Sequence, residues 1–220
     1  TINSLYTTSN TCVINGLTST GTEYVWAVRA VCGSDTSMYS DSDVFKTTCF
    51  DGAVTEFPYI EDFEFTLDCW SQEYVSSTED WYLNNGSNYS SDSAYTGSSN
   101  ALFNYSGDGP TTMLISPVLN LNSISNPYLM FAHMQRDWAG DQDTLGVYYR
   151  VHQDSAWVYL TSYNDNIQTW QLDSIGLPVS SATFQIGFLA HAGWGYGVAI
   201  DSVVVNGEGP LCAQPNLTVS

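Results

Sequence analysis

Two stretches that lie far apart in this sequence place acidic residues among apolar ones. Residues 58–70 read PYIEDFEFTLDCW, and residues 193–205 read GWGYGVAIDSVVV, a glycine-rich bend that leads into a β-branched strand holding Asp201. A carboxylate is costly to bury without a partner, so two such strands invite a cation between them. A hard cation takes roughly six to eight oxygen ligands, which carboxylates and backbone carbonyls supply. The pattern therefore indicates holding or binding rather than catalysis.

The residues that catalysis requires are few in this chain. Two of its three histidines, His133 and His191, lie in apolar runs, where a single histidine is usually a hydrogen-bonded core residue. The sequence contains neither a Gly-x-Ser-x-Gly motif nor HExxH. Pairs of acids are too common in so acidic a chain to indicate a glycosidase. We therefore predict no catalytic residues and no enzymatic activity.

The composition limits the classes of partner. Lys and Arg total 4 against 23 Asp and Glu, which gives a formal net charge of −19. Such a surface repels phosphate backbones and anionic membranes, so we expect no nucleic-acid partner. No apolar run is long enough to span a bilayer, so we expect no membrane insertion. Only 12% of residues are charged and 14% are aromatic, which is typical of extracellular all-β modules rather than of disordered chains.

Helix signals are almost absent, and short runs rich in Val, Tyr, Thr and Trp alternate with Gly, Asn, Ser and Asp clusters. Before a linker-like passage at residues 49–56 we expect the strands Thr11–Leu17, Tyr24–Cys32 and Asp43–Thr48. After it we expect ten more: Tyr59–Glu64, Trp81–Asn84, Ala101–Asn104, Thr112–Ile115, Tyr128–Met134, Thr144–His152, Val158–Ser162, Trp170–Ser174, Thr183–His191 and Ala199–Val205. Ten strands suffice for two packed antiparallel sheets, so the predicted fold class is all-β.

The two ends of the chain resemble a known module. The run INGL followed by GTEYVWAVRAVC (residues 21–32) is similar to the last strands of a fibronectin type III module, with Tyr24 as its corner tyrosine. The final run CAQPNLTVS (residues 212–220) resembles the opening strand of another such module. The resemblance implies a partial fibronectin type III (Ig-like) sandwich at residues 1–48 and the start of a further module at residues 209–220.

The middle of the chain, residues 49–208, resembles the MAM domain and the related adhesin domains of secreted bacterial proteins such as the gingipains. The matching runs are EDFE, CW, DW, ALF, LISPVLNL, LMFAHMQ, DTLGVYYR, FQIGFLAHAG and AIDSVVV, in the family's order and spacing. The cysteines of the animal MAM pattern are missing, which favours the bacterial branch. The resemblance implies a jelly-roll-like β-sandwich that is non-catalytic and carries a structural calcium ion (Ca²⁺). Its implied ligands are Glu64, Asp201 and Asp62, with carbonyls of residues 98–100.

Three aromatic residues, Trp138, Trp194 and Tyr196, stand in glycine-rich, loop-like surroundings. Exposed rings of this kind stack on sugars or anchor protein contacts, so we name these three as candidate ligand-binding residues. The alternative is that they cap the ends of the core. Trp70, Trp81 and Trp170 are expected inside the core. The acidic loop RDWAGDQD (residues 136–143) is either a second cation site or, as we favour, a solvated loop.

The five cysteines are widely spaced, with no CxxC pair, which favours disulfides in an oxidising compartment over a metal cluster. We predict Cys49–Cys69 as the best pairing, with Cys12–Cys32 as a further possibility. The module resemblance instead implies that Cys212 belongs to a following module and that Cys32 pairs with a cysteine upstream of this sequence. The sequence leaves these alternatives open.

Together these features predict a non-catalytic extracellular adhesion or binding module of a multi-domain secreted protein at the bacterial cell surface. Its expected partner is an extracellular protein or glycan, and it is expected to be monomeric in isolation. The competing functions are a carbohydrate-binding accessory module of a secreted hydrolase and a structural spacer. A carbohydrate-binding module should bind glycans and lose that binding when Trp138 or Trp194 is mutated. A spacer should bind no ligand at all.

Overall fold

The computed structural model describes residues 6–9, 11, 14, 23–46, 49 and 52–208. The chain divides into two compact units, Thr1–Cys49 and Phe50–Ser220. Most of the predicted strand Thr11–Leu17 and all of the predicted further module at residues 209–220 lie outside the described residues. Within the described ranges, no helix is long and apolar enough to cross a membrane.

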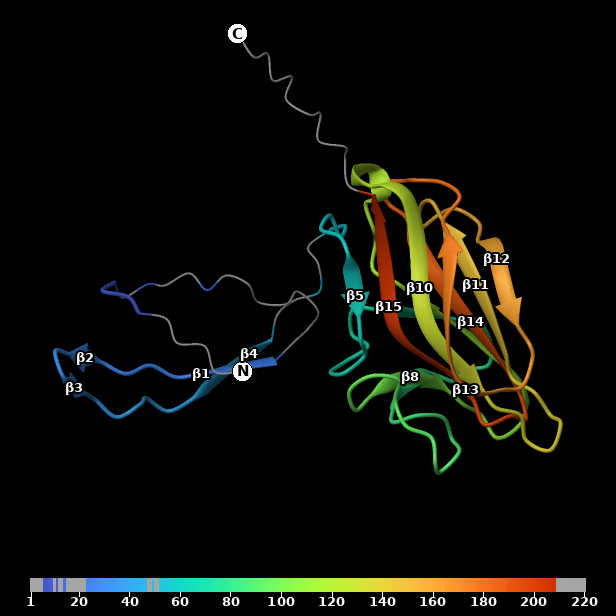
Figure 1. Ribbon diagram of the computed structural model, residues 1–220, viewed down its shortest axis with the longest axis horizontal. Coiled ribbons are helices and arrows are strands. Elements are labelled where there is room, and N and C mark those ends of the chain that lie inside the picture. The colour runs from blue at the N-terminus through green and yellow to red at the C-terminus, as the bar shows by residue number, and fades with distance from the viewer. Residues whose placement is uncertain are drawn as a thin grey trace, which may run out of the picture. The chain divides into compact units, whose positions relative to one another are not determined.

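The second unit consists of two antiparallel sheets (Figure 1). The first sheet has the strand order β13-β10-β15-β8-β7, with β5 also paired to β15; its strands are β5 (Tyr59–Glu61), β7 (Trp81–Asn84), β8 (Asn100–Phe103), β10 (Ser125–Gln135), β13 (Ile167–Gly176) and β15 (Val198–Glu208). The second sheet has the order β12-β11-β14-β9-β6; its strands are β6 (Ser71–Ser76), β9 (Asp108–Ile115), β11 (Thr144–Arg150), β12 (Val158–Tyr163) and β14 (Gln185–Gly193). A short 3-10 helix, η1 (Leu121–Ser123), precedes β10. The all-β, jelly-roll-like sandwich predicted from the sequence is confirmed.

The first and last strands of this unit lie side by side. Tyr59 of β5 pairs with Val205 of β15, and Glu61 pairs with Val203. Figure 1 shows β15 between β5 and β10, as the register requires. Phe63 and Ile200 lie in the same hydrophobic core, so distant parts of the chain close one body.

Alternation along β10 explains how the sheets pack. Leu129 and Phe131 point into the core, where the ring of Phe131 lies 5.0 Å from that of Phe188 on β14 in the opposite sheet. Burial of each such side chain stabilises the fold by about 1.5–3 kcal/mol. Met134, on the other parity of β10, instead joins Leu102 and Ala199 in a second small cluster outside the main core.

Two segments of this unit differ from the sequence prediction. The polar run at residues 71–76 is the edge strand β6, paired with β9, although its mostly exposed side chains give no apolar alternation. Of the passage predicted to be linker-like, residues 49–56, the part from residue 52 onward packs on the sandwich through Val54, which is 2% exposed. The backbone of Val54 donates to Val118 and accepts from Asn120, which fixes this passage against the body.

The first unit, as far as it is described, contains two short antiparallel pairs: β1 (Glu23–Trp26) with β4 (Asp43–Lys46), and β2 (Val31–Cys32) with β3 (Asp35–Thr36). The predicted continuous strand Tyr24–Cys32 is therefore interrupted. At the interruption, serine hydroxyls replace strand carbonyls, since Val28 N–H donates to Ser40 Oγ and Ala30 N–H to Ser37 Oγ. The fibronectin type III identity of residues 1–48 stays a prediction.

The cysteines follow the first of the two predicted pairings. Cys49 and Cys69 form a disulfide. Cys32 is exposed and carries a free thiol, so the Cys12–Cys32 pairing is not formed. Cys12 itself and Cys212 lie outside the described residues.

Candidate functional site

One buried carboxylate organises the loops at the end of the sandwich where β10 ends and β15 begins. Asp143 is 2% exposed, and its Oδ1 accepts hydrogen bonds from Gly193 N–H (2.6 Å) and Gly195 N–H (3.0 Å). Its Oδ2 accepts from Gly197 N–H at 2.7 Å. The run GWGYG wraps around Asp143 because a Cβ at Gly195 would collide with this carboxylate and Gly197 has a φ of 95°. The arrangement fixes the β14–β15 loop.

This loop end displays two of the three predicted ligand-binding residues. Trp138, in the β10–β11 loop, is 50% exposed, and its backbone forms a two-way bridge with Asp141. Trp194, in the β14–β15 loop, is 48% exposed and has a φ of 68°, in the left-handed region that costs an L-residue about 1–2 kcal/mol. Its N–H donates to Gly107 of the β8–β9 loop. The third, Tyr196, is half-buried and packs against other residues of the loops.

Tyr196 connects the loop end to the strand β10. Its N–H donates to the carbonyl of Arg136, the residue after β10, and its carbonyl accepts from Asn88 N–H. Its ring meets that of Tyr89 edge-on at 5.1 Å, and the Arg136 guanidinium lies 4.3 Å from the centre of the Tyr89 ring. Tyr196 is therefore held within the loop end, whereas Trp138 and Trp194 are more exposed. Ligand binding by the three aromatic residues stays a prediction.

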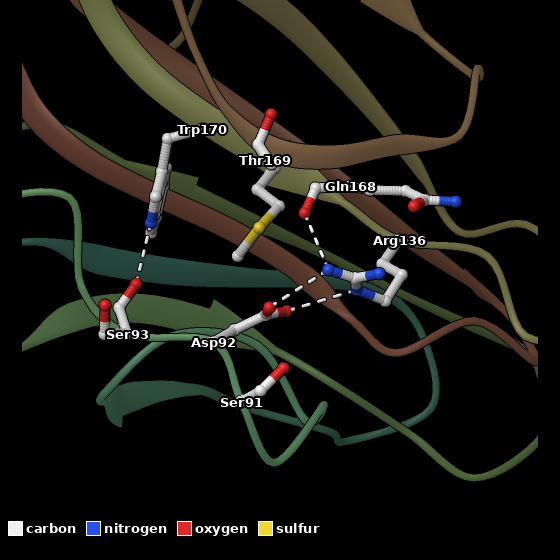
Figure 2. Close-up of a pocket in the computed structure, with 8 residues that line it drawn as sticks. Ser91, Asp92, Ser93, Arg136, Gln168, Thr169 and Trp170 are labelled. Atoms are coloured by element: carbon white, nitrogen blue, oxygen red, sulfur yellow. Dashed lines mark hydrogen bonds and ion pairs between the residues drawn. The ribbon is translucent and has the colours of Figure 1, made fainter.

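Beside this cluster lies a shallow cavity of about 180 Å³, which we call the Trp170 slot. It is lined by Ser91, Asp92 and Ser93 of the β7–β8 loop, Met134 of β10, Arg136, and Gln168, Thr169 and Trp170 of β13. Figure 2 shows Trp170 on one side of the slot and the Arg136–Asp92 pair on the other. Arg136 Nη2 donates to Asp92 Oδ1 at 3.1 Å and to the Gln168 carbonyl at 2.8 Å, while Nε donates to Asp92 Oδ2 at 3.3 Å.

The position of Trp170 corrects the sequence prediction, which placed it in the main core with Trp70 and Trp81. Trp70 and Trp81 are 5% and 2% exposed, as predicted. Trp170 is only partly buried and packs on the small outer cluster of Leu102, Met134 and Ala199. The reason is strand parity: β13 is an edge strand, and Trp170 lies on its outer face, where Nε1–H donates to the Ser93 carbonyl at 2.7 Å.

The predicted metal ligands Glu64 and Asp201 meet at one segment, residues 95–99. Both Glu64 oxygens accept from Ser98 N–H, Oε1 also accepts from Ser99 N–H, and Oε2 accepts from the Ser98 hydroxyl. Asp201 Oδ2 accepts from Thr96 N–H at 3.0 Å. Gly97, with a φ of 63°, leaves room for the Glu64 carboxylate. Asp62 is exposed and accepts from the N–H of Glu64.

The two carboxylates at this segment, Glu64 and Asp201, carry like charges that repel each other. Burial raises the pKa of Asp201, and the charge of Glu64 raises it further, while backbone N–H donors act against both. For Glu64, burial is outweighed by the donors on Ser98 and Ser99, and its pKa is lowered. Two neighbouring carboxylates fit a hard cation, but Ser98 and Ser99 present N–H groups rather than carbonyls to Glu64. Across the described ranges, no group of three His, Cys, Asp or Glu side chains is placed to hold a metal ion. Calcium at these residues therefore stays a prediction.

A buried acid beside the metal candidates was not singled out from the sequence. Glu61, 6% exposed, accepts from Trp70 Nε1–H at 3.1 Å and from Phe63 N–H at 3.1 Å. Burial raises its pKa. Glu61 therefore joins the first acidic run to the Cys-Trp pair, and its role is to hold β5 in place.

The histidines are placed in two ways. His133 is fully buried, with Nε2 3.0 Å from Asp173 and Nδ1 3.1 Å from Gln135, as expected of a hydrogen-bonded core residue. His191 differs from the expectation, because its side chain is 42% exposed. It faces the outside of the second sheet, where Nδ1 bonds with Thr111 Oγ1.

Comparisons with known proteins bear on the fold. No family model matches the sequence, and no curated protein matches it either. Three solved cleaved adhesin domains of the Lys-gingipain of Porphyromonas gingivalis have a similar fold. The K1 domain gives a TM-score of 0.57 at 18% identity, covering 70% of this chain and 100% of that domain. The K3 domain gives 0.52 at 18% identity (67% and 96% covered), and the K2 domain 0.51 at 13% identity (68% and 98% covered). The predicted resemblance to gingipain adhesin domains is thus confirmed for the fold.

Proposed function

We propose that the sandwich at residues 52–208 is a non-catalytic binding module of an extracellular, multi-domain adhesive protein at a bacterial surface. The observation that carries the proposal is the loop end, where a buried carboxylate fixes a backbone that displays two half-exposed tryptophans. Large aromatic side chains exposed on a rigid frame are the usual anchors of binding surfaces. Rigidity favours binding because little conformational entropy is lost when the partner docks.

Other features support the location and the class of function. The Cys49–Cys69 disulfide suits an oxidising compartment outside the cytosol. Three domains of similar fold are named adhesin domains, which suggests the same class of role here. We expect the partner to be an extracellular protein or a glycan, and we expect the module to be monomeric.

The test is binding of the full chain to arrays of glycans and of extracellular proteins. Truncation of a central tryptophan in an interface costs about 2 kcal/mol or more, which is about 30-fold in affinity. Trp138→Ala and Trp194→Ala should each weaken binding by about that factor. Phe65→Ala, which removes an aromatic ring that is 69% exposed outside the loop end, is the matched control and should have no effect. Absence of wild-type binding on both arrays would overturn the proposal in favour of a spacer.

Calcium stabilisation is a separate part of the proposal. It is supported by the meeting of Glu64 and Asp201 at one segment, since a cation would stabilise the charged form of Asp201, whose pKa is raised by burial and, to a smaller extent, by the charge of Glu64. A bound ion would have to displace the N–H donors of Ser98 and Ser99 and recruit carbonyl oxygens in their place. Asp62 is exposed next to Glu64 and is the nearest further carboxylate in the sequence.

A further inference from the structure

The Trp170 slot has one flat aromatic wall that is held in place. The Nε1–H bond to the Ser93 carbonyl fixes one edge of the indole, and Leu102, Met134 and Ala199 support it from the sheet. In Figure 2 the indole is seen edge-on, with one face turned toward the Arg136–Asp92 pair. The indole therefore gives a ligand with a flat apolar face a wall that is already held in place.

The lining of the slot is electrically neutral, although the whole chain carries a net charge of −19. Asp92 and Arg136 are its only charged residues, and they form a bidentate pair whose side chains are 9% and 17% exposed. A charged ligand would lose its hydration on entering the slot and would find no unpaired opposite charge there, because Asp92 and Arg136 are paired with each other. Desolvation therefore opposes both cations and anions here, and a neutral ligand is favoured.

The polar groups of the slot call for hydroxyl groups on the ligand. The Asp92 carboxylate has about four acceptor positions and uses three, for Arg136 Nε, Arg136 Nη2 and the Ser87 hydroxyl. The position that remains, on Oδ1, accepts only a donor. The hydroxyl of Ser91, which also lines the slot, can donate or accept. A purely apolar side chain would leave these groups unpaired.

We propose that the Trp170 slot binds a single ring of a neutral saccharide. A pyranose has an apolar C–H face for the indole and hydroxyls at its edge for Asp92 and the rim. The volume of about 180 Å³ is below the roughly 300–1,000 Å³ of sites for larger ligands, which fits one ring and not a long chain. For a ligand of about twelve non-hydrogen atoms, ordinary efficiency gives a Kd on the order of 1 mM. The inference rests on the proposed binding function and names the ligand of one part of that surface.

The experiment is a ¹H–¹⁵N titration of the full chain with methyl glycosides of glucose, galactose, mannose, fucose, xylose, arabinose, N-acetylglucosamine and N-acetylgalactosamine. The indole N–H signal of Trp170, assigned by its loss in Trp170→Phe, should shift with at least one of them at a Kd of about 1 mM. Methyl glucuronide, which is charged, should bind at least tenfold more weakly. If no neutral glycoside shifts this signal, or if the charged one binds best, the proposal is wrong.

Slot-filling variants give the second readout. Thr169 and Ser91 are exposed at the rim, so Thr169→Tyr and Ser91→Tyr should weaken glycoside binding at least tenfold while leaving the fold intact. Ser174→Tyr, also exposed and on β13 but outside the slot, is the matched control and should bind as wild type. Glycoside binding that survives both slot-filling variants would overturn the proposal. The proposal would also be wrong if the two variants weakened the binding of a polypeptide but not of any glycoside. The loop-end variants Trp138→Ala and Trp194→Ala test the proposed function separately, because they lie outside the slot.

Discussion

Asp143 offers the sharpest test of how the loop end is held. It accepts three backbone N–H bonds, and a hydrogen bond to a charged group contributes about 1.5–3 kcal/mol. Asp143→Ala would remove all three, a loss of about 4–9 kcal/mol, which is comparable to the 5–15 kcal/mol that stabilises an ordinary domain. That variant would simply unfold, so the informative change is Asp143→Asn.

Asp143→Asn keeps the shape of the side chain but changes what it can accept. The amide oxygen can still accept from Gly193 and Gly195, whereas the amide NH₂ now faces the N–H of Gly197. One bond and the charge on the other two are lost, so the free energy of unfolding should fall by about 2–4 kcal/mol. For a domain of this size that lowers Tm by roughly 5–15 °C.

Two measurements check this expectation. Thermal melting should show the fall in Tm, and amide hydrogen exchange at Gly193, Gly195 and Gly197 should quicken more than exchange in β10 or β14. Asp141→Asn, an exposed acid of the same loop, is the matched control and should change neither. A variant at Asp143 with unchanged Tm and unchanged exchange would refute the idea that this carboxylate fixes the loop.

Three further predictions concern stability. Burial raises the pKa of Glu61, so its contribution to stability is present below the ordinary glutamate pKa and is lost as pH rises through the raised value. The free energy of unfolding of wild type, relative to that of Glu61→Gln, should therefore decline with rising pH. A difference between the two proteins in urea melts that does not depend on pH would contradict this. Reduction of the Cys49–Cys69 disulfide should lower the free energy of unfolding by about 3 kcal/mol. In the unreduced native protein, a maleimide should label the peptide that contains Cys32 but neither peptide of the disulfide, which mass spectrometry checks. Calcium at 100 times its Kd should raise the free energy of unfolding by about 2.7 kcal/mol over chelated protein, with the gain absent in Asp201→Asn; identical melts in calcium and chelator would remove the metal.

The sequence predicted the strands whose apolar residues alternate or run together. Two of the expected strands, Tyr128–Met134 and Ala199–Val205, form the centres of β10 and β15. Their apolar side chains pack either in the main core or in the outer cluster. The edge strand β6 was missed, since an edge strand needs only one partner and its exposed polar residues leave no periodic signal. Val54 was missed for the opposite reason, because a single buried residue in a short passage has no period at all.

For the site, the sequence indicated residue types, and the fold decided which of them meet. The acids Glu64 and Asp201 and the tryptophans at 138 and 194 stand out in the sequence by their surroundings. The role of Asp143 was hidden among the other acids of its loop, although the glycines at 193, 195 and 197 were a usable signal, since such spacing lets three N–H groups approach one acceptor.

Composition and local pattern alone determined that this chain is an acidic, strand-rich protein with no motif for catalysis, because charge, alternation and turn residues act over a few neighbours. Only the tertiary structure decided that Trp170 stands outside the core facing Arg136 and Asp92, which are 34 and 78 positions away in the sequence. That pairing depends on the strand order β13-β10-β15-β8-β7 and on which face of an edge strand a residue occupies. Both are set by packing between segments that are remote in the chain, and no local pattern records them.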